Sequence, residues 1–537
     1  MIAEPVTVAD EDAAVSVATV RSFLGRHRRR NWVDWYVLGF GLVIAAIYGS
    51  DFLATPLSRL SGPAGHAAAT HAAATQAVAG TGLVIGVGAG LLLLAQALGP
   101  LALSPADASW LLLTPLARRG ILRRSALTIA LLAAVAGALL GVLGLAMAGP
   151  YLRLAESGLP GTWLFLSAVA GAGCCLAAVA VEALAQPGQR PRALIRAVCL
   201  AVAVLAMAGS VAGERWSALT RAVTAVFGGL STPVFDTAAL VSLTLAAVAW
   251  LLLWLRLASF PASVLRDDSA RSGRALLAAQ FLNFSLLFWI AEDNHWRGRL
   301  LRSRPWPKLP PVLALAWVDW RRLGRRPGPL ALLAVASAVP ALLGIAVTGR
   351  VRPDLIAAAL IAGALAAGSQ GTAAAKRDQD DPALRRLLGV DPGRALVARA
   401  VLPSLLSGGW LALALTVLCA AGALSGWLWP LLGLIAGPGV AAAVLRLART
   451  ARINPADRGP DTPMGSTPPW LVSRVLSVIV AAIGAAPLVG ALLKGEAHAT
   501  VVIDQCAASV IVLWVYLMIA RALSRQMSAG LPSRPNK

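Results

Sequence analysis

The sequence predicts an all-α integral membrane protein with about twelve transmembrane helices in two six-helix halves. Of its 537 residues, 58% are hydrophobic and only 13% are charged, and the mean hydropathy is +0.72. So much apolar surface exceeds what a water-soluble core can bury. The formal net charge of +22 would suggest nucleic acid binding in a soluble protein. In a membrane protein, however, an excess of Lys and Arg is explained by their preference for cytoplasmic segments. We therefore expect no nucleic acid partner.

Each predicted span is an apolar window near the roughly 20 residues that a membrane helix needs. The windows are 33–54, 77–101, 126–149, 162–184, 194–213, 236–257, 328–348, 354–375, 397–422, 426–447, 471–494 and 501–521. With a cytoplasmic N-terminus, about 40 of the 47 Lys and Arg residues fall in cytoplasmic segments, as the positive-inside rule requires. We therefore expect a multi-pass protein of the plasma (inner) membrane with both termini in the cytoplasm.

A polar connector, 258–327, separates the two halves. It contains the apolar stretch 275–291, which carries Gln280, Asn283 and Ser285. If this stretch crossed the membrane, the Arg-rich segment after it would move outside, so we expect an interfacial or re-entrant helix. The predicted organisation is a cytoplasmic tail with an interfacial helix (1–32), half one (33–257), the connector (258–327), half two (328–521) and a cytoplasmic tail (522–537).

The two halves share local sequence patterns that suggest a diverged duplication. Ser104-Pro105 is followed ten residues later by Thr114-Pro115, and Asp381-Pro382 is followed ten residues later by Asp391-Pro392. Both pairs lie in the cytoplasmic loop between the second and third spans of their half. The tetrapeptide "WVDW" also occurs twice, at 32–35 and 317–320, near the first span of each half.

Each of these loops carries two helix-start signals. Ser104 and Asp381 are N-cap residues followed by Pro, whose fixed φ suits the first helical position, and Asp107 completes a capping box with Ser104. Thr114-Pro115 and Asp391-Pro392 repeat the signal, while each Pro disfavours helix in the residue before it. We expect a short helix, a corner and a second helix that enters the membrane, with Trp110 at the interface.

Basic residues flank both corners and hold them at the cytoplasmic face, because Arg is costly within the bilayer. They are Arg118, Arg119, Arg123 and Arg124 in the first half and Arg385, Arg386, Arg394 and Arg399 in the second. A charged loop that only binds anionic membrane lipid is the simpler alternative. The repeated pair of helix starts favours a rigid element that docks on a partner.

The segment "WLLLTPLARRGIL" resembles the cytoplasmic loop between the second and third helices of type-2 ABC exporter permeases. The resemblance implies a coupling helix that sits in a groove of a separate ATPase subunit, and an interfacial helix at 20–32. It also implies two ATPase copies for two halves. The resemblance extends to the architecture of both halves, but the sequence motif that matches is only about a dozen residues long. In the second half, Gly389-Val390-Asp391-Pro392 departs from the Thr-Pro pattern, which weakens the expectation of docking there.

Several site classes have no support in the sequence. There is no G-x-x-x-x-G-K-[ST] motif, so we expect no bound nucleotide or other cofactor in this chain and no enzymatic activity of its own. His66 and His71 are five residues apart, a spacing that does not place two ligands on one helix face, and no Cys or carboxylate accompanies them. No metal is therefore expected. The spans hold few ionisable residues, and Glu182 and Asp504 are expected near the membrane surfaces. The five cysteines, Cys174, Cys175, Cys199, Cys419 and Cys506, are expected to pack between helices.

Gly82, Gly86 and Gly90 repeat every four residues, a pattern that lets another helix approach closely. We expect packing within the fold rather than a subunit interface. Four prolines inside predicted spans, Pro340, Pro403, Pro438 and Pro487, are expected to kink their helices.

These features predict the membrane-spanning permease subunit of an ATP-driven exporter, in which movement of a P-loop ATPase is passed through the two loops to the spans. The chain could act as a monomer, or as a homodimer if one half is not a full transmembrane domain. The alternatives are a non-transporting scaffold or regulator and a polytopic lipid-processing enzyme. The sequence does not identify the transported substrate.

Overall fold

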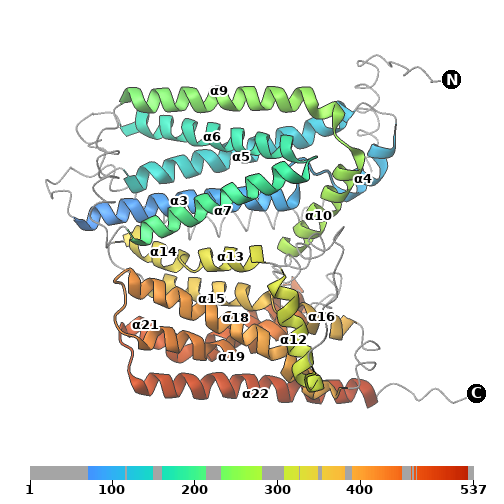
Figure 1. The fold of residues 1–537 in the computed structure, drawn as a ribbon, viewed down its shortest axis with the longest axis vertical. Coiled ribbons are helices and arrows are strands. Elements are labelled where there is room, and N and C mark those ends of the chain that lie inside the picture. The colour runs from blue at the N-terminus through green and yellow to red at the C-terminus, as the bar shows by residue number, and fades with distance from the viewer. Residues whose placement is uncertain are drawn as a thin grey trace, which may run out of the picture. The chain divides into compact units, whose positions relative to one another are not determined.

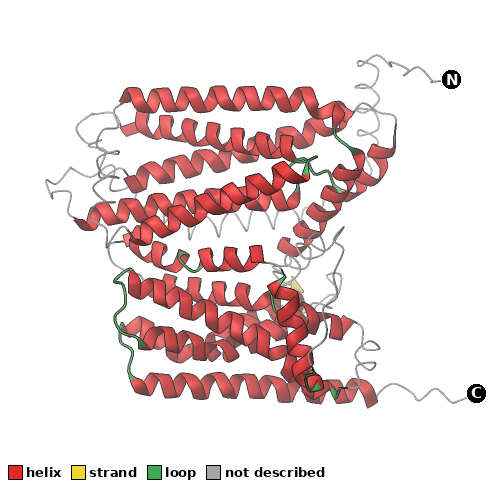
Figure 2. Ribbon diagram, in the orientation of Figure 1, coloured by secondary structure: helices red, strands yellow, loops and turns green. Residues whose placement is uncertain are grey.

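A computed structural model describes residues 71–114, 118–148, 160–212, 232–280, 308–325, 327–348, 353–380, 390–449, 461–462, 465–466 and 469–529. Regular structure in these residues is helical except for two two-residue strands (Figure 2), β1 (Asp461–Thr462) and β2 (Gly465–Ser466), which pair antiparallel. Helices are expected here because a bilayer offers the backbone no hydrogen-bond partners, so each segment must satisfy its own.

Eight described helices are long and apolar enough to cross a membrane, and up to eleven spans result if each of three bent helix pairs is one span. All predicted windows from 77–101 onward fall on these helices. The first window, 33–54, and the predicted interfacial helix at 20–32 lie outside the described residues. The chain is therefore a multi-pass helical membrane protein with eight to eleven candidate spans in its described part, where about twelve were predicted for the whole chain.

The chain divides into two compact units, of which the first comprises Met1–Arg274 with Ile345–Arg350. Its helices are α3 (His71–Leu98), α4 (Pro105–Trp110), η1 (Leu111–Leu113), α5 (Arg118–Ala148), α6 (Pro160–Ala185), α7 (Gln189–Ala212), α9 (Thr232–Arg256), η4 (Leu257–Ser259) and most of α10 (Ala262–Gln280). Helix α5 packs on α3 and α6, α6 packs on α9, and α3 packs on α7. Figure 1 shows the long helices side by side, with α4 and α10 at the same end.

The second unit comprises Ala275–Gly344 with Val351–Lys537. Its described helices are α12 (Pro311–Gly324), α13 (Pro327–Ala336), α14 (Val339–Thr348, at the unit boundary), α15 (Pro353–Ser369), α16 (Ala373–Asp380), α18 (Pro392–Ala420), α19 (Leu428–Arg449), α20 (Pro469–Gly484), α21 (Ala486–Lys494) and α22 (Ala499–Ala529). Helix α18 packs on α15 and α19, and α19 packs on α22 and α20. Helix α12 packs against α18 and lies across the ends of the spans in Figure 1.

Glycines set the closest helix crossings in both units. In the first, Gly141 of α5 meets Gly171 of α6, and a Cβ on Gly141 would lie 3.3 Å from the Gly171 Cα. In the second, Gly408 of α18 meets Gly437 of α19, and a Cβ on Gly408 would lie 2.5 Å from the Leu434 carbonyl oxygen. Small residues allow such contact, which is the main source of helix association in lipid.

Prolines break some spans and not others. Pro487 stands at the start of α21, which is bent by 65° from α20, and Pro340 follows the break between α13 and α14. Pro403 and Pro438 lie inside α18 and α19, which continue through them. At the α20–α21 break, Gln505 of α22 donates to the Gly484 carbonyl (2.7 Å) and accepts from the Leu488 amide (2.9 Å). A neighbouring helix thus satisfies the backbone groups freed by the break.

The structure describes only the first residues of the helix predicted over 275–291. These residues belong to α10, which runs from Ala262 to Gln280 and so begins in the polar part of the connector, where no helix was predicted. Pro261 precedes its first residue, and Leu265, Asp268 and Ser269 are buried against the first unit. Tertiary packing therefore stabilises a helix where the hydropathy pattern shows none, and residues 281–291 lie outside the described part.

Candidate functional site

The chain leaves α3 through a tight turn that leads into α4. Gly99 has φ of +84°, a conformation that glycine adopts readily and other residues avoid. A Cβ at this position would also lie 2.6 Å from the Cβ of Asp268. The turn therefore requires glycine both for its backbone conformation and for the close approach of α10.

Helix α4 begins as the sequence predicts. The Ser104 hydroxyl accepts a hydrogen bond from the Asp107 amide (3.1 Å), and Pro105 occupies the first turn. The helix lasts only six residues and tightens into the 3₁₀ turn η1. Its inward side joins a buried apolar cluster with the ends of α5, α6 and α9, whose members include Ala108, Leu111, Leu112, Leu122, Leu253, Phe260 and Leu265.

The outward side of this short helix is apolar and exposed. Trp110 is 76% exposed and Leu113 is 71% exposed. We call the segment Ser104–Thr114 the α4 element. It is firmly packed on one side and presents a tryptophan and a leucine on the other.

The corner after the α4 element also follows the predicted pattern where it is described. Thr114 has extended backbone angles, and its hydroxyl donates to the Leu111 carbonyl (2.7 Å). Residues 115–117, including Pro115, lie outside the described part, and α5 begins at Arg118.

The two arginines that follow the corner bind the protein itself. Arg118 Nη1 donates to the Phe260 carbonyl (2.8 Å), and Arg119 Nη2 donates to the Leu255 carbonyl (3.2 Å). These carbonyls lie at the end of α9 and just beyond it, where helical partners run out. Arg123 and Arg124, one turn further along α5, are exposed.

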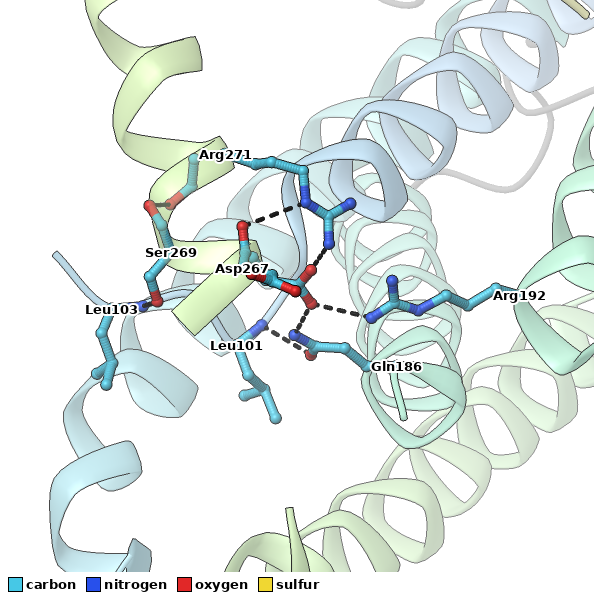
Figure 3. Close-up of polar contacts among 9 residues, drawn as sticks. Leu101, Leu103, Gln186, Arg192, Asp267, Ser269 and Arg271 are labelled. Carbon is cyan, nitrogen blue, oxygen red and sulfur yellow. Dashed lines mark hydrogen bonds and ion pairs between the residues drawn. The ribbon is translucent and has the colours of Figure 1, made fainter. Parts of the chain in front are cut away.

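A buried carboxylate at one end of the first unit holds the backbone that leads into the α4 element. Asp268 of α10 is fully buried and forms ion pairs with Arg271 and with Arg192 of α7 (2.9 Å). The Gln186 amide donates to the same carboxylate (2.5 Å), and its oxygen accepts from the Leu101 amide (3.3 Å). Figure 3 shows Arg271, Arg192 and Gln186 converging on this point. We call Asp268, Arg192, Arg271 and Gln186 the Asp268 cluster.

Further polar contacts tie the same turn to its neighbours. Ser269 of α10 accepts from the Leu103 amide (2.9 Å), and Ser125 of α5 donates to the Ala102 carbonyl (2.8 Å). Gly273 lies so close to the ring of Pro105 that a Cβ there would overlap it. The backbone from Gly99 to Pro105 is thus held by α5, α10 and the α6–α7 turn.

The corresponding loop of the second unit is described only in part. Asp391 is the N-cap of α18 and accepts from the amides of Gly393 (2.9 Å) and Arg394 (3.0 Å), with Pro392 in the first turn. Arg394 is exposed. Asp381, Pro382, Arg385 and Arg386 lie outside the described residues, so the structure describes the second helix start of this loop and not the first.

A second buried ion cluster lies at the base of α18. Arg399 donates to Asp319 of α12 (2.7 Å) and to Asp378 of α16 (2.9 Å). Asp319 belongs to the repeated "WVDW" tetrapeptide, and its role as a buried partner of Arg399 was not predicted. The Asp268 cluster was also missed, although two adjacent acids in the Arg-rich run "RDDSARSGR" were a signal that one of them is paired.

The predicted glycine stripe lies against a helix of the same unit at two of its three positions. Gly82 faces Ser210 and Ala206 of α7, and Gly86 faces Met207 of α7. Gly90 has open space where a Cβ would be. The first two glycines therefore serve intramolecular packing between α3 and α7.

Among the described residues, no group of three or more His, Cys, Asp or Glu side chains is arranged to hold a metal ion. The five cysteines are free thiols. The clusters around Asp268 and Arg399 combine acids with arginines, so each charged side chain in them has a partner of opposite charge. These ion pairs have a structural role: they hold short helices in place at the ends of the spans.

Comparison with known proteins gives one match. No curated protein and no solved structure is significantly similar to the chain. One family model matches residues 72–454, which cover the described helices from α3 to α19. The chain belongs to this family, DUF6297, a family of unknown function.

Proposed function

We propose that the chain is the membrane-spanning permease subunit of an ATP-driven, ABC-type exporter in the plasma membrane, with cytoplasmic termini. In this proposal a separate P-loop ATPase docks on the α4 element, and a second copy docks on the loop 381–392. The twelve spans form two related halves. Closure of the ATPases on ATP pushes the docked loops and tilts the spans that follow them.

The observation that carries the proposal is the combination of rigidity and exposure in the α4 element. Its base is fixed by the Asp268 cluster and Ser269, yet Trp110 and Leu113 face outward. An element that only linked two spans would need neither a capped helix nor a buried polar anchor. A docking element needs both, because an applied force must move the attached spans rather than deform the loop.

The repeated packing order supports two related halves. In the first unit the helix after the α4 element, α5, packs on its neighbours α3 and α6, and α6 packs on the last candidate span of the unit, α9. In the second unit α18 packs on α15 and α19, and α19 packs on the last helix, α22. The glycine crossing lies between α5 and α6 in one unit and between α18 and α19 in the other.

The direct test places a photoreactive residue at Leu113 of the full chain in membranes of producing cells. Irradiation is expected to capture a P-loop ATPase, identified by its peptides, because the Leu113 side chain faces outward. The matched control is Trp427, which is as exposed as Trp110 at 76% but directly precedes α19, at the outer end of the predicted span 426–447. Capture of the same proteins from both positions, or of lipid alone from Leu113 while the ATPase is active, contradicts the proposal.

A substitution separates docking from folding. Trp110→Ala is expected to weaken co-purification of the captured ATPase by about 30-fold, the loss of about 2 kcal/mol typical of a central interface tryptophan. Trp427→Ala is expected to leave it unchanged, and both variants are expected to elute as the wild type does in size-exclusion chromatography. Charge reversal at Arg118 or Arg119 is a poorer test, since both side chains hold carbonyls near the end of α9.

A further inference from the structure

Glu182 is a buried acid that belongs neither to the Asp268 cluster nor to the α4 element. It lies near the end of α6, inside a candidate span, and is only 4% exposed. Neither of its carboxyl oxygens has a hydrogen-bond partner, and no ion pair to it occurs among the described residues. The neighbouring buried Gln96 and Gln186, by contrast, are both hydrogen-bonded.

A buried carboxylate without a counter-charge is one of the most costly arrangements in a protein. Removing an ionised carboxylate from water is so unfavourable that such a group instead takes up a proton and becomes neutral. Even the neutral acid is destabilising when it stays unpaired, so packing alone gives no reason for glutamate here. An ionisable group inside a membrane helix therefore calls for a functional explanation.

The charged and titratable groups around Glu182 are few. Helices α5 and α9 contribute apolar side chains, such as Leu122 and Leu253, to the cluster that holds the flanking Ala180 and Ala183. On α7, Cys199 lies close enough to interact electrostatically with Glu182. Arg196, one turn before Cys199, donates to Gln96 of α3 (3.2 Å), and Arg192 is paired with Asp268. No described cation is bonded to Glu182.

Polar side chains lie between Glu182 and the end of the unit. Gln186 stands four residues after Glu182, in the α6–α7 turn just beyond Ala185. It is hydrogen-bonded to Asp268, which is paired in turn with Arg192, whose side chain is 20% exposed. Glu182 itself is bonded to none of these groups.

From this burial without any partner we infer that Glu182 is a reversible proton-binding site. At neutral pH it holds a proton taken from water, and at high pH it releases that proton to water. Release leaves a negative charge between α6 and α7, close to Cys199. The inference does not depend on an ATPase partner.

Infrared spectroscopy of the purified full chain tests the site without requiring access by a reagent. At pH 7 the wild type is expected to show the carbonyl band of a protonated carboxyl group, and Glu182→Gln is expected to lack it. Asp267→Asn is the control, because Asp267 is an exposed carboxylate in α10 and contributes no such band. The band is expected to shift in D₂O, and to vanish at pH 10 and return at pH 7.

Two outcomes overturn the inference. If the wild type shows no protonated-carboxyl band at pH 7 that Glu182→Gln lacks, Glu182 is ionised and holds no proton. If the band is present but neither D₂O nor high pH changes it, the proton does not exchange and the site is not reversible.

If Glu182→Gln does not fold, a hydrophobic carbodiimide replaces the variant as the probe. It adds the carboxylic O–H across its N=C=N group and so modifies protonated acids within membranes. Modification of the wild type that maps to Glu182 at pH 7 and is lost at pH 10 supports the site. Modification confined to other acids overturns it.

Discussion

At the residue scale, the polar side chains that shape the described structure are buried and find their partners on distant segments. Asp268 joins α10 to α7 and to the α6–α7 turn, and Arg399 joins α18 to α12 and α16. Other charged side chains lie near both residues in the sequence, so the sequence does not say which of them is buried. What distinguishes each is complete or nearly complete burial with a compensating charge.

Removal of the Asp268 charge is expected to destabilise the protein strongly. Asp268→Asn leaves Arg192 and Arg271 without their carboxylate, and breaking a buried ion pair on one side costs about 3–5 kcal/mol. Asp267→Asn changes the adjacent exposed carboxylate and is expected to stay within about 0.5 kcal/mol of the wild type. Thermal unfolding of both variants in detergent measures the difference, and equal melting temperatures would show that the Asp268 cluster does not hold α10.

At the element scale, close helix crossings rather than hydrophobicity determine which spans pair. Lipid is as apolar as leucine, so helices in a membrane gain most where small residues let their backbones approach. Gly408 and Gly437 provide this approach between α18 and α19, and Gly141 and Gly171 provide it between α5 and α6. The stripe that the sequence pattern emphasised, at Gly82, Gly86 and Gly90, is only one of several such contacts.

Two adjacent glycines in α18 offer a matched test of this crossing. Gly408→Ala places a methyl group 2.5 Å from the Leu434 carbonyl oxygen, so we expect a loss of about 1–3 kcal/mol from overpacking. Gly409→Ala meets nothing within 4 Å and is expected to be neutral or to stabilise the helix by up to about 1 kcal/mol. Urea or thermal unfolding of the two variants compares them, and a stabilising Gly408→Ala would mean that α18 and α19 do not cross at this point.

At the scale of the whole molecule, the side of the membrane reached by the connector decides how the second half is oriented. Residues 281–307 lie outside the described part, but α10 and Lys308 flank them. The positive-inside rule predicts that both flanks lie in the cytoplasm. That orientation would also place the loops 104–124 and 381–392 on one side, as the proposed exporter requires.

Single cysteines at Arg266 and Lys308, both exposed, test this orientation in a background without the five native cysteines. A membrane-impermeant maleimide is expected to label neither position in intact cells and both in permeabilised cells. A cysteine at Glu496, which follows α21 in a predicted outer loop, is the control and is expected to be labelled in intact cells. Labelling of position 308 but not 266 in intact cells would mean that the segment between them crosses the membrane.

The sequence by itself determined the membrane class, the positions of the spans and the starts of α4 and α18. These features are local: a span is a run of apolar residues, and an N-cap is a Ser or Asp followed by Pro. Thr114, predicted to end one helix and precede another, adopts the expected extended backbone for the same reason.

Only the tertiary structure decided what depends on contacts between distant residues. The hydropathy pattern missed α10's polar first half, because that helix is stabilised by burial of Asp268 and Ser269 against the first unit. Arg118 and Arg119 looked like free surface charges, but each finds a carbonyl more than 130 residues away at the end of α9. Glu182 was expected near a membrane surface, a depth that stays a prediction. Its burial within the protein follows from the packing of α6 among its neighbours, which no local pattern encodes.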